Sequence, residues 1–299
     1  MAKLISNDRP LEPRIQAALY GLGGSRKTFT SMHLPLTGKT WEHEGKPGKI
    51  IYIAADKTSP KLDSISIEDR KRVLMYVPNG NQTVDKDGNL KTDWKVEMAR
   101  LCQTTWIDKH PEAIAIVYDT VTASSVKLLH ENAKMAYFSD KGARSGPSAL
   151  DHRISQEKES MFKVGQEGDY NMVQQTTIQN LDWLITLNES SLHIICLFHE
   201  CLSKQKDGLP QVYGPASVGQ MGPRQIPQLF GTNLWLEVES GELDPKQKGS
   251  TRVSMIDSQK HISNVKCSDP SLVPEHKFIG KNPQECRDMW TWIQGIKSK

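Results

Sequence analysis

Long apolar runs and cysteine pairs are both missing from this 299-residue chain. No apolar run approaches the roughly 20 residues that a bilayer-spanning helix needs, and the first ten residues lack the apolar stretch of a signal peptide. The five cysteines contain no C-x-x-C pair, which argues against a zinc finger and against a disulfide framework. We therefore expect a protein with reduced cysteines that stays in the cytosol.

A strong charge of either sign is also lacking. The 38 basic and 35 acidic residues leave a net charge of +3, which permits a polyanionic partner but does not require one. Neither internal repeats nor low-complexity segments occur. With 37% hydrophobic and 24% charged residues, the composition is that of an ordinary globular protein, and the length allows one large α/β domain or a core with a small appendage.

Four short apolar runs alternate with longer polar or amphipathic segments. They span residues 14–20, 49–55, 113–118 and 192–198. Each run is continuous rather than alternating, as is typical of parallel strands that are covered on both faces. Their alternation with helical segments predicts βαβ units, and hence an α/β fold with a doubly wound, mostly parallel sheet.

Further elements are predicted around this sheet. Apolar residues recur at intervals of three and four in residues 94–108 and 176–187, which predicts two amphipathic helices. Turn residues within 78–89 predict a hairpin. Residues 139–153 and 201–230, which are rich in Gly, Ser, Pro or Gln, are interpreted as long loops, and loops of this length are usually functional or disordered.

The chain is expected to divide near residue 240. Residues 1–240 are interpreted as the core, and residues 241–299 as a small C-terminal β extension with a closing helix. A strand at 233–239 is predicted at this boundary, and a strand at 251–258 and a helix at 283–296 are predicted beyond it.

A glycine-rich segment, here called the glycine loop, lies between the first predicted strand and a predicted helix. It reads Gly21-Leu22-Gly23-Gly24-Ser25-Arg26-Lys27-Thr28. Glycines let consecutive backbone N–H groups turn towards a phosphate, and the helix N-terminus adds positive potential. In such a loop Lys27 would reach the β- and γ-phosphates of a nucleotide, and the Thr28 hydroxyl would hold Mg²⁺.

The glycine loop resembles the Walker A pattern G-x-x-x-x-G-K-[ST], with Arg26 in place of the last glycine. We expect Gly23 and Gly24 to need positive φ angles, and Arg26 to be acceptable as an L-residue at the helix entrance. The pattern leaves open whether the Arg26 side chain crowds a nucleotide or points away. A glycine-rich turn that binds no ligand is the alternative interpretation.

Polar side chains follow three of the four predicted strands. Asp119 ends a Walker B-like strand, where its carboxylate would emerge beside the glycine loop and hold Mg²⁺. Asp56 would orient and deprotonate the attacking water, because the carboxyl ends of neighbouring strands converge. His199, followed by Glu200, would hydrogen-bond the γ-phosphate. The alternatives are N-caps for the acids and a structural role for the histidine.

The order of these motifs resembles the RecA-type ATPase core, and more narrowly the RecA-core-only NTPases of phages, whose relatives include single-strand annealing proteins. The similarity covers about residues 14–240 and depends on the glycine loop, Asp56, residues 116–120, His199 and the segment from 210 to 230. It implies a Mg²⁺-dependent ATPase that acts on single-stranded DNA in recombination, annealing or replication, in the host cytoplasm if a phage encodes it. Within the family, Asp56 falls at the position of the catalytic acid and His199 at that of a polar sensor.

The resemblance also implies that the two long loops contact single-stranded DNA. Basic side chains suit contacts with the nucleic acid backbone, and an aromatic ring suits base stacking. The candidate residues in the second loop are Lys204, Lys206, Tyr213 and Arg224. A solvated surface loop is the alternative interpretation. A homo-oligomer or a replication or recombination protein is a further expected partner.

Two other functions stay open at this point. A P-loop phosphotransferase would need an arginine-rich lid, for which Arg144 and Arg153 are the candidates. A nucleotide-gated loader or scaffold protein would bind a nucleotide with weak hydrolysis or none, as expected if Arg26 disables the loop. ATP turnover, measured with and without single-stranded DNA and with phosphoryl acceptors, separates these functions.

Overall fold

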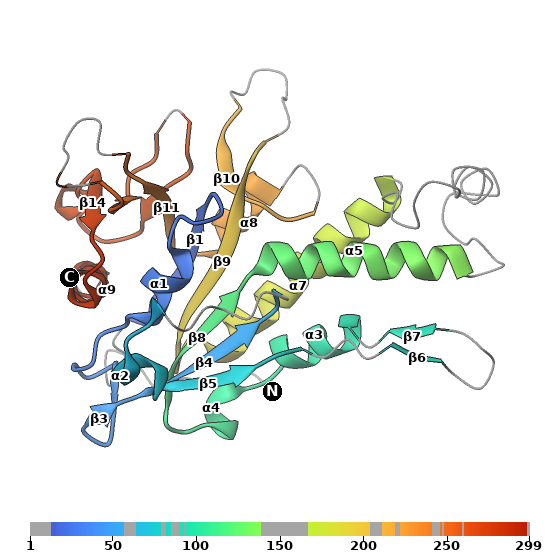
Figure 1. The fold of residues 1–299 in the computed structure, drawn as a ribbon, viewed down its shortest axis with the longest axis horizontal. Helices are drawn as coiled ribbons and strands as arrows, with labels where there is room; N and C mark the ends of the chain where they lie inside the picture. The colour runs from blue at the N-terminus through green and yellow to red at the C-terminus, as the bar shows by residue number, and fades with distance from the viewer. Residues whose placement is uncertain are drawn as a thin grey trace.

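Six parallel strands form the centre of one large sheet in the described part of the chain (Figure 1). The computed structural model describes residues 13–56, 64–78, 82–84, 90–92, 94–138, 167–203, 211–218, 222–240, 246, 248–258 and 260–297. The spatial order is β11 (Thr232–Val238), β1 (Gln16–Gly21), β9 (His193–Leu202), β8 (Ala113–Asp119), β4 (Lys49–Ala54) and β5 (Val73–Tyr76). The four strands predicted from apolar runs are confirmed, and the fold is α/β with a mostly parallel sheet.

Antiparallel strands continue this sheet beyond β11. β12 (Thr251–Ser254) pairs with β11, β14 (His276–Ile279) pairs with β12, and the short β13 (Asn264–Val265) also pairs with β11. The predicted strands at 233–239 and 251–258 are therefore present, and the C-terminal β extension belongs to the same sheet as the parallel strands.

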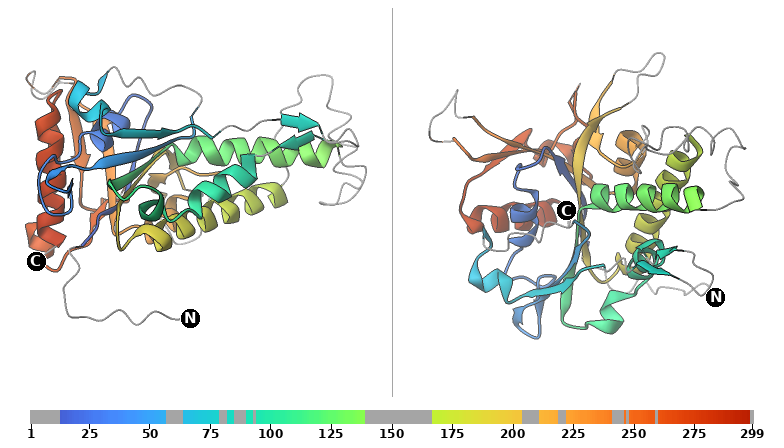
Figure 2. Two further views of the ribbon diagram at one scale, coloured as in Figure 1. Left: turned by 90° about the horizontal axis from the view of Figure 1, so that it is seen from below. Right: turned by 45° about the vertical axis from the view of Figure 1, so that its right-hand side comes forward.

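Helices cover both faces of the sheet (Figure 2). One face packs against α1 (Lys27–Met32) and α9 (Pro283–Lys297), and the other against α3 (Trp94–Cys102), α5 (Val121–Phe138), α7 (Glu167–Asn188) and α8 (Gly222–Leu229). Because successive side chains of a strand point to opposite faces, β4 gives Ile50 and Tyr52 to the first cluster and Ile51 and Ile53 to the second. No described helix has the length and apolar character needed to cross a bilayer.

The predicted helix at 94–108 is interrupted. α3 ends at Cys102, and the short α4 (Trp106–Lys109) follows after a break. The Asn188 side chain stabilises this break, since it accepts a hydrogen bond from the Trp106 N–H at 2.8 Å and donates one to the Thr104 carbonyl at 3.1 Å. The periodicity of residues 94–108 cannot indicate a break whose hydrogen-bond partner comes from the end of α7.

Residues 201–230 are not one long loop, so that prediction is wrong. β9 continues to Leu202, β10 (Tyr213–Pro215) pairs antiparallel with its end, and α8 follows. The apolar pattern also does not predict β5, which is a short, partly exposed strand. The predicted hairpin is confirmed, since β6 (Gln82–Val84) pairs with β7 (Leu90–Thr92) on either side of residues 85–89. The remaining short elements are β2 (Glu42–His43), β3 (Lys46–Pro47), α2 (Ile67–Arg70) and the 3₁₀ helix η3 (Pro270–Leu272).

A buried carboxylate joins the closing helix to the core. Asp69 in α2 is 0% exposed, and its oxygens lie 3.2 Å from Arg72 Nη1 and 2.7 Å from Arg287 Nη2 of α9. The Ser66 hydroxyl also donates to Asp69 at 2.6 Å. A buried charge needs such partners to offset its lost hydration. This cluster therefore holds α9 in one position on the sheet.

We expect Asp69→Ala to lower the free energy of unfolding by about 3 kcal/mol, because it leaves buried guanidinium groups without their carboxylate. Glu68→Ala is the matched control, since Glu68 lies 3.5 Å from the same Arg287 but its side chain is 63% exposed. That change should cost less than about 1 kcal/mol. Urea denaturation of both variants measures the difference, and equal losses would contradict a stabilising role that depends on burial.

Candidate functional site

A pocket of about 770 Å³ opens at the carboxyl ends of the parallel strands. The chain leaves β1 towards the face that holds α1 and leaves β9 towards the face that holds α8. Neighbouring strands with connections on opposite faces form the crevice in which open α/β sheets bind ligands. The lining residues are Gly23, Gly24, Ser25, Arg26, Lys27, Thr28, Phe29, Tyr52, Ala54, Asp56, Ser64, Asp119, Thr120, His199, Gly249 and Lys281.

Lys27 is folded back over the glycine loop. Its Nζ donates to the carbonyl oxygens of Gly21 and Leu22, both at 2.8 Å, and to the Ser25 hydroxyl at 3.1 Å. Burial lowers the pKa of the Lys27 ammonium to about 8, and the negative charge of Asp119 opposes this shift. An anionic oxygen is a stronger acceptor than these carbonyls. The ammonium is therefore placed to exchange loop carbonyls for the oxygens of a bound phosphate.

Arg26 adopts a left-handed backbone conformation, with φ of 63° and ψ of 25°. Gly24 has the predicted positive φ, at 83°, whereas Gly23 does not. The prediction is therefore correct for Gly24 and wrong for Gly23 and Arg26. A left-handed residue that carries a Cβ costs about 1 kcal/mol. Contacts of the Arg26 side chain offset this strain.

Those contacts direct the Arg26 side chain to the C-terminal extension. Nη1 donates to the Gly280 carbonyl at 2.7 Å, and the guanidinium carbon lies 4.2 Å from the centre of the Phe29 ring. Together they anchor the guanidinium at the junction of β14 and α9. The guanidinium is therefore held at the C-terminal extension and not over the backbone N–H groups of the glycine loop.

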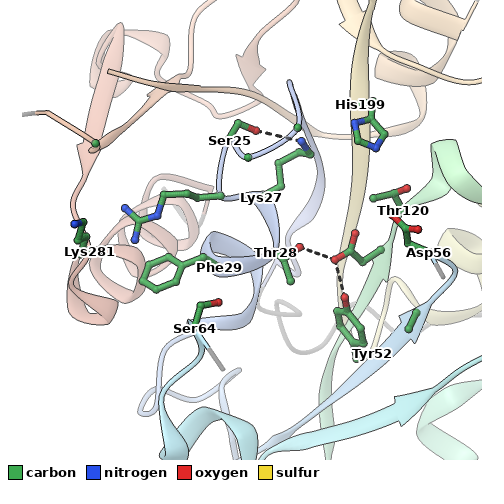
Figure 3. A pocket seen from close by; sticks show the side chains of 16 residues that line it. Ser25, Lys27, Thr28, Phe29, Tyr52, Asp56, Ser64, Thr120, His199 and Lys281 are labelled. Atoms are coloured by element: carbon green, nitrogen blue, oxygen red, sulfur yellow. Dashed lines mark hydrogen bonds between the residues drawn. The ribbon is translucent and has the colours of Figure 1, made fainter. Parts of the chain in front are cut away.

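Two hydroxyl groups donate to one oxygen of Asp119. Thr28 Oγ1 and the Tyr52 hydroxyl each lie 2.6 Å from Asp119 Oδ2 (Figure 3). Burial raises the pKa of the Asp119 carboxyl, and these two hydrogen bonds and Lys27 oppose the shift. Burial, reinforced by the same carboxylate, raises the pKa of the Tyr52 phenol and keeps it a donor.

Tyr52 is a site residue that the motif analysis misses. Its position in the buried run of β4 is that of a core aromatic residue, and the ring does belong to the core cluster. Its role could be inferred only from the chemistry of the tyrosine hydroxyl, not from its position in the sequence. A buried tyrosine hydroxyl needs a hydrogen-bond partner, and an acid at the end of the neighbouring strand is a natural acceptor.

The oxygen atoms of Asp119 and its neighbour Thr28 are of the kind that bind magnesium. The described residues contain no group of three or more His, Cys, Asp or Glu side chains arranged to hold a metal ion. Mg²⁺ in nucleotide sites usually takes one or two protein oxygens and completes its shell with phosphates and water. The Thr28 hydroxyl and the Asp119 carboxylate provide adjacent oxygen ligands of this kind, so the residues present fit Mg²⁺ better than a softer metal.

Asp56 and His199 also line the pocket, as the sequence predicts. The Asp56 N–H donates to the Asp119 carbonyl at 3.4 Å, and the His199 N–H donates to the Thr122 hydroxyl at 3.0 Å. Burial lowers the pKa of the His199 imidazole, with a further contribution from the charge of Lys27. The imidazole is therefore neutral near pH 7, a state with one ring N–H to donate.

The structure does not bring Glu200 into the pocket. Because successive side chains of a strand point in opposite directions, Glu200 faces away from His199. Its Oε2 instead accepts a hydrogen bond from Trp235 Nε1 at 2.8 Å. The apolar run ends before these two polar residues and does not indicate which of them faces the pocket, and β9 continues past both to Leu202.

Of the residues predicted to bind DNA, the two that the structure describes, Tyr213 and Arg224, do not line this pocket. Tyr213 lies in β10, where its ring stacks on His261 with the centres 5.2 Å apart, and Arg224 lies in α8. Lys204, Lys206 and the predicted loop 139–153 lie outside the described residues.

The arrangement of side chains in the pocket is the evidence for the function of this chain. Neither protein-family models nor curated proteins match it. The function has to be argued from the residues that the fold brings to the pocket: Lys27, Thr28, Asp56, Asp119 and His199.

Proposed function

We propose that this chain binds a nucleoside triphosphate together with Mg²⁺ and hydrolyses it, as an ATPase with a RecA-like core. The observation that carries the proposal is the contact between Thr28 and Asp119, 2.6 Å apart although 91 residues separate them in sequence. Lys27 lines the same pocket. An ammonium, a hydroxyl and a carboxylate in this arrangement suit the phosphates and metal of a bound triphosphate.

The strand order supports the RecA-like assignment. β9, which carries His199, lies between β1 with its glycine loop and β8 with Asp119. β4, which leads to Asp56, lies on the other side of β8. In the proposed function, four adjacent strands would therefore supply the groups that bind phosphate, sense the terminal phosphate, hold the metal and activate the water.

The chemistry divides among these residues. The glycine-loop N–H groups and Lys27 bind and orient the phosphates. Thr28 and Asp119 would hold Mg²⁺, which neutralises phosphate charge when it is bound. Asp56 accepts the proton of the attacking water, and neutral His199 donates a hydrogen bond to the terminal phosphate.

Single-stranded DNA stays a proposed partner on the strength of the resemblance. Its test is binding at low salt with and without a non-hydrolysable ATP analogue, because affinity that depends on phosphate contacts falls steeply with salt. Absence of DNA binding in both states would favour the alternatives. ATP binding without turnover would indicate a loader or scaffold, and transfer to an added acceptor would indicate a phosphotransferase.

Lys27→Ala should weaken binding of ATP with Mg²⁺ by about 100-fold or more, because it removes the buried cation at the phosphates. Calorimetric titration measures the affinity. Lys39→Ala, which removes an exposed lysine that does not line the pocket, is the control and should leave it unchanged. Wild-type affinity in the Lys27 variant would refute the phosphate site.

Asp56→Asn should slow ATP hydrolysis by roughly 100-fold while ATP affinity changes little, since the amide keeps the shape of the carboxylate but cannot accept the proton. Glu200→Gln is the comparison, because its carboxylate bonds Trp235 and faces away from the pocket. Steady-state phosphate release distinguishes the two. A slow Glu200 variant beside a normal Asp56 variant would reverse the assignment.

Tyr52→Phe should raise the Mg²⁺ concentration needed for half-maximal ATP binding by roughly 3- to 10-fold, because Asp119 loses one of the hydrogen bonds that orient it. Tyr20→Phe removes a hydroxyl that bonds the Ile262 carbonyl instead, and it serves as the control. The measurement is ATP affinity across a Mg²⁺ titration. Identical Mg²⁺ dependence in the two variants would show that Tyr52 does not position Asp119.

A further inference from the structure

The two ends of the pocket differ in chemistry (Figure 3). Asp56, Thr120 and His199 lie on one side of Lys27 and Thr28, and Phe29 and Lys281 lie on the other. Lys281 comes from the turn between β14 and α9, and Gly249, which also lines the pocket, precedes β12. The C-terminal extension therefore provides part of the pocket wall.

If the proposed function holds, the difference between the two ends decides which end of the pocket receives the terminal phosphate and which receives the nucleoside. A triphosphate is a linear chain whose terminal phosphate must meet the water handled by Asp56. Its sugar and base must then extend to the opposite end of the pocket, where Phe29, Gly249 and Lys281 lie. A pocket of about 770 Å³ falls within the size range of small-molecule sites, so it has room for a complete nucleotide.

The turn that carries Lys281 is held in place from two directions. Arg26 donates to the Gly280 carbonyl at 2.7 Å, and the Gly280 N–H donates to the Glu285 carboxylate. A Cβ at position 280 would lie 2.8 Å from a Glu285 oxygen, so a larger residue there would displace the Glu285 carboxylate. Arg26 thus links the glycine loop directly to the residue before Lys281.

Lys281 is exposed and lines the pocket, so its ammonium is open to a ligand there. Glu285 bonds the Gly280 N–H, and Lys248 lies with Lys281 in an adjoining cavity of about 540 Å³. A lysine ammonium has three donors and no acceptor, which suits sugar hydroxyl oxygens and the ring nitrogens or carbonyl oxygens of a base. The Phe29 ring adds an apolar surface at the same end.

We infer that the β14–α9 turn forms the nucleoside end of the pocket and that Lys281 is a binding residue for the sugar or base. The ligand class is then a nucleotide rather than a bare polyphosphate. Arg26, where the Walker A pattern has glycine, is a positioning residue for this turn.

The test compares two ligands, Mg²⁺-ATP and Mg²⁺-tripolyphosphate, by calorimetric titration. Lys281→Ala should bind ATP roughly 3- to 10-fold more weakly and tripolyphosphate with unchanged affinity, because only ATP reaches the nucleoside end. Lys281→Arg should restore most of the ATP affinity. Lys266→Ala is the control, an exposed lysine of the same extension that lines neither cavity.

The outcomes separate this inference from the function on which it rests. Equal loss for both ligands in Lys281→Ala would place the lysine at the phosphates and overturn the inference, as would ATP affinity equal to wild type. Both results leave the triphosphate site standing. Failure of the wild-type protein to bind either ligand would refute the proposed function itself, and this inference with it.

Discussion

A carboxylate buried at the end of a central strand has to be hydrogen-bonded, and this requirement organises the pocket. Asp119 is 7% exposed and receives its hydrogen bonds from Thr28 of α1 and Tyr52 of β4. Without such donors, the charged form of a buried acid is strongly disfavoured. The same hydrogen bonds fix the start of α1 and the end of β4 relative to β8. The site and the local packing of three elements therefore depend on one oxygen, Asp119 Oδ2.

The second organising feature is the link between the glycine loop and the C-terminal extension. Arg26 takes a left-handed conformation that glycine would adopt without strain, and its side chain bonds the Gly280 carbonyl. Asp69 and Arg287 meanwhile hold α9 on the core. Residues far apart in sequence thus form one wall of the pocket. The segment after residue 240 is therefore part of the pocket and not a separate appendage.

The parts of the fold that were predictable are those with local physical causes. Continuous apolar runs identify β1, β4, β8 and β9, because strands buried on both faces need apolar residues throughout. Asp56 and Asp119 follow from their places at strand ends, where parallel sheets collect polar groups, and Lys27 and Thr28 follow from the glycine-loop pattern. The break between α3 and α4 depends instead on the side chain of Asn188, and the β10 strand depends on the extension of β9. In both cases the residues responsible lie outside the segment whose structure they determine.

The sequence by itself determined the α/β class, the glycine loop and the acids that accompany it, because backbone freedom, burial and strand polarity act over a few neighbouring residues. Only the tertiary structure decided that Tyr52 shares Asp119 with Thr28, that His199 rather than Glu200 faces the pocket, and that Lys281 lines its far end. Those outcomes depend on which strands become neighbours and which way each side chain points in the assembled sheet. The sequence shows which residue types are present, whereas contacts between distant segments decide which side chains come together in the pocket.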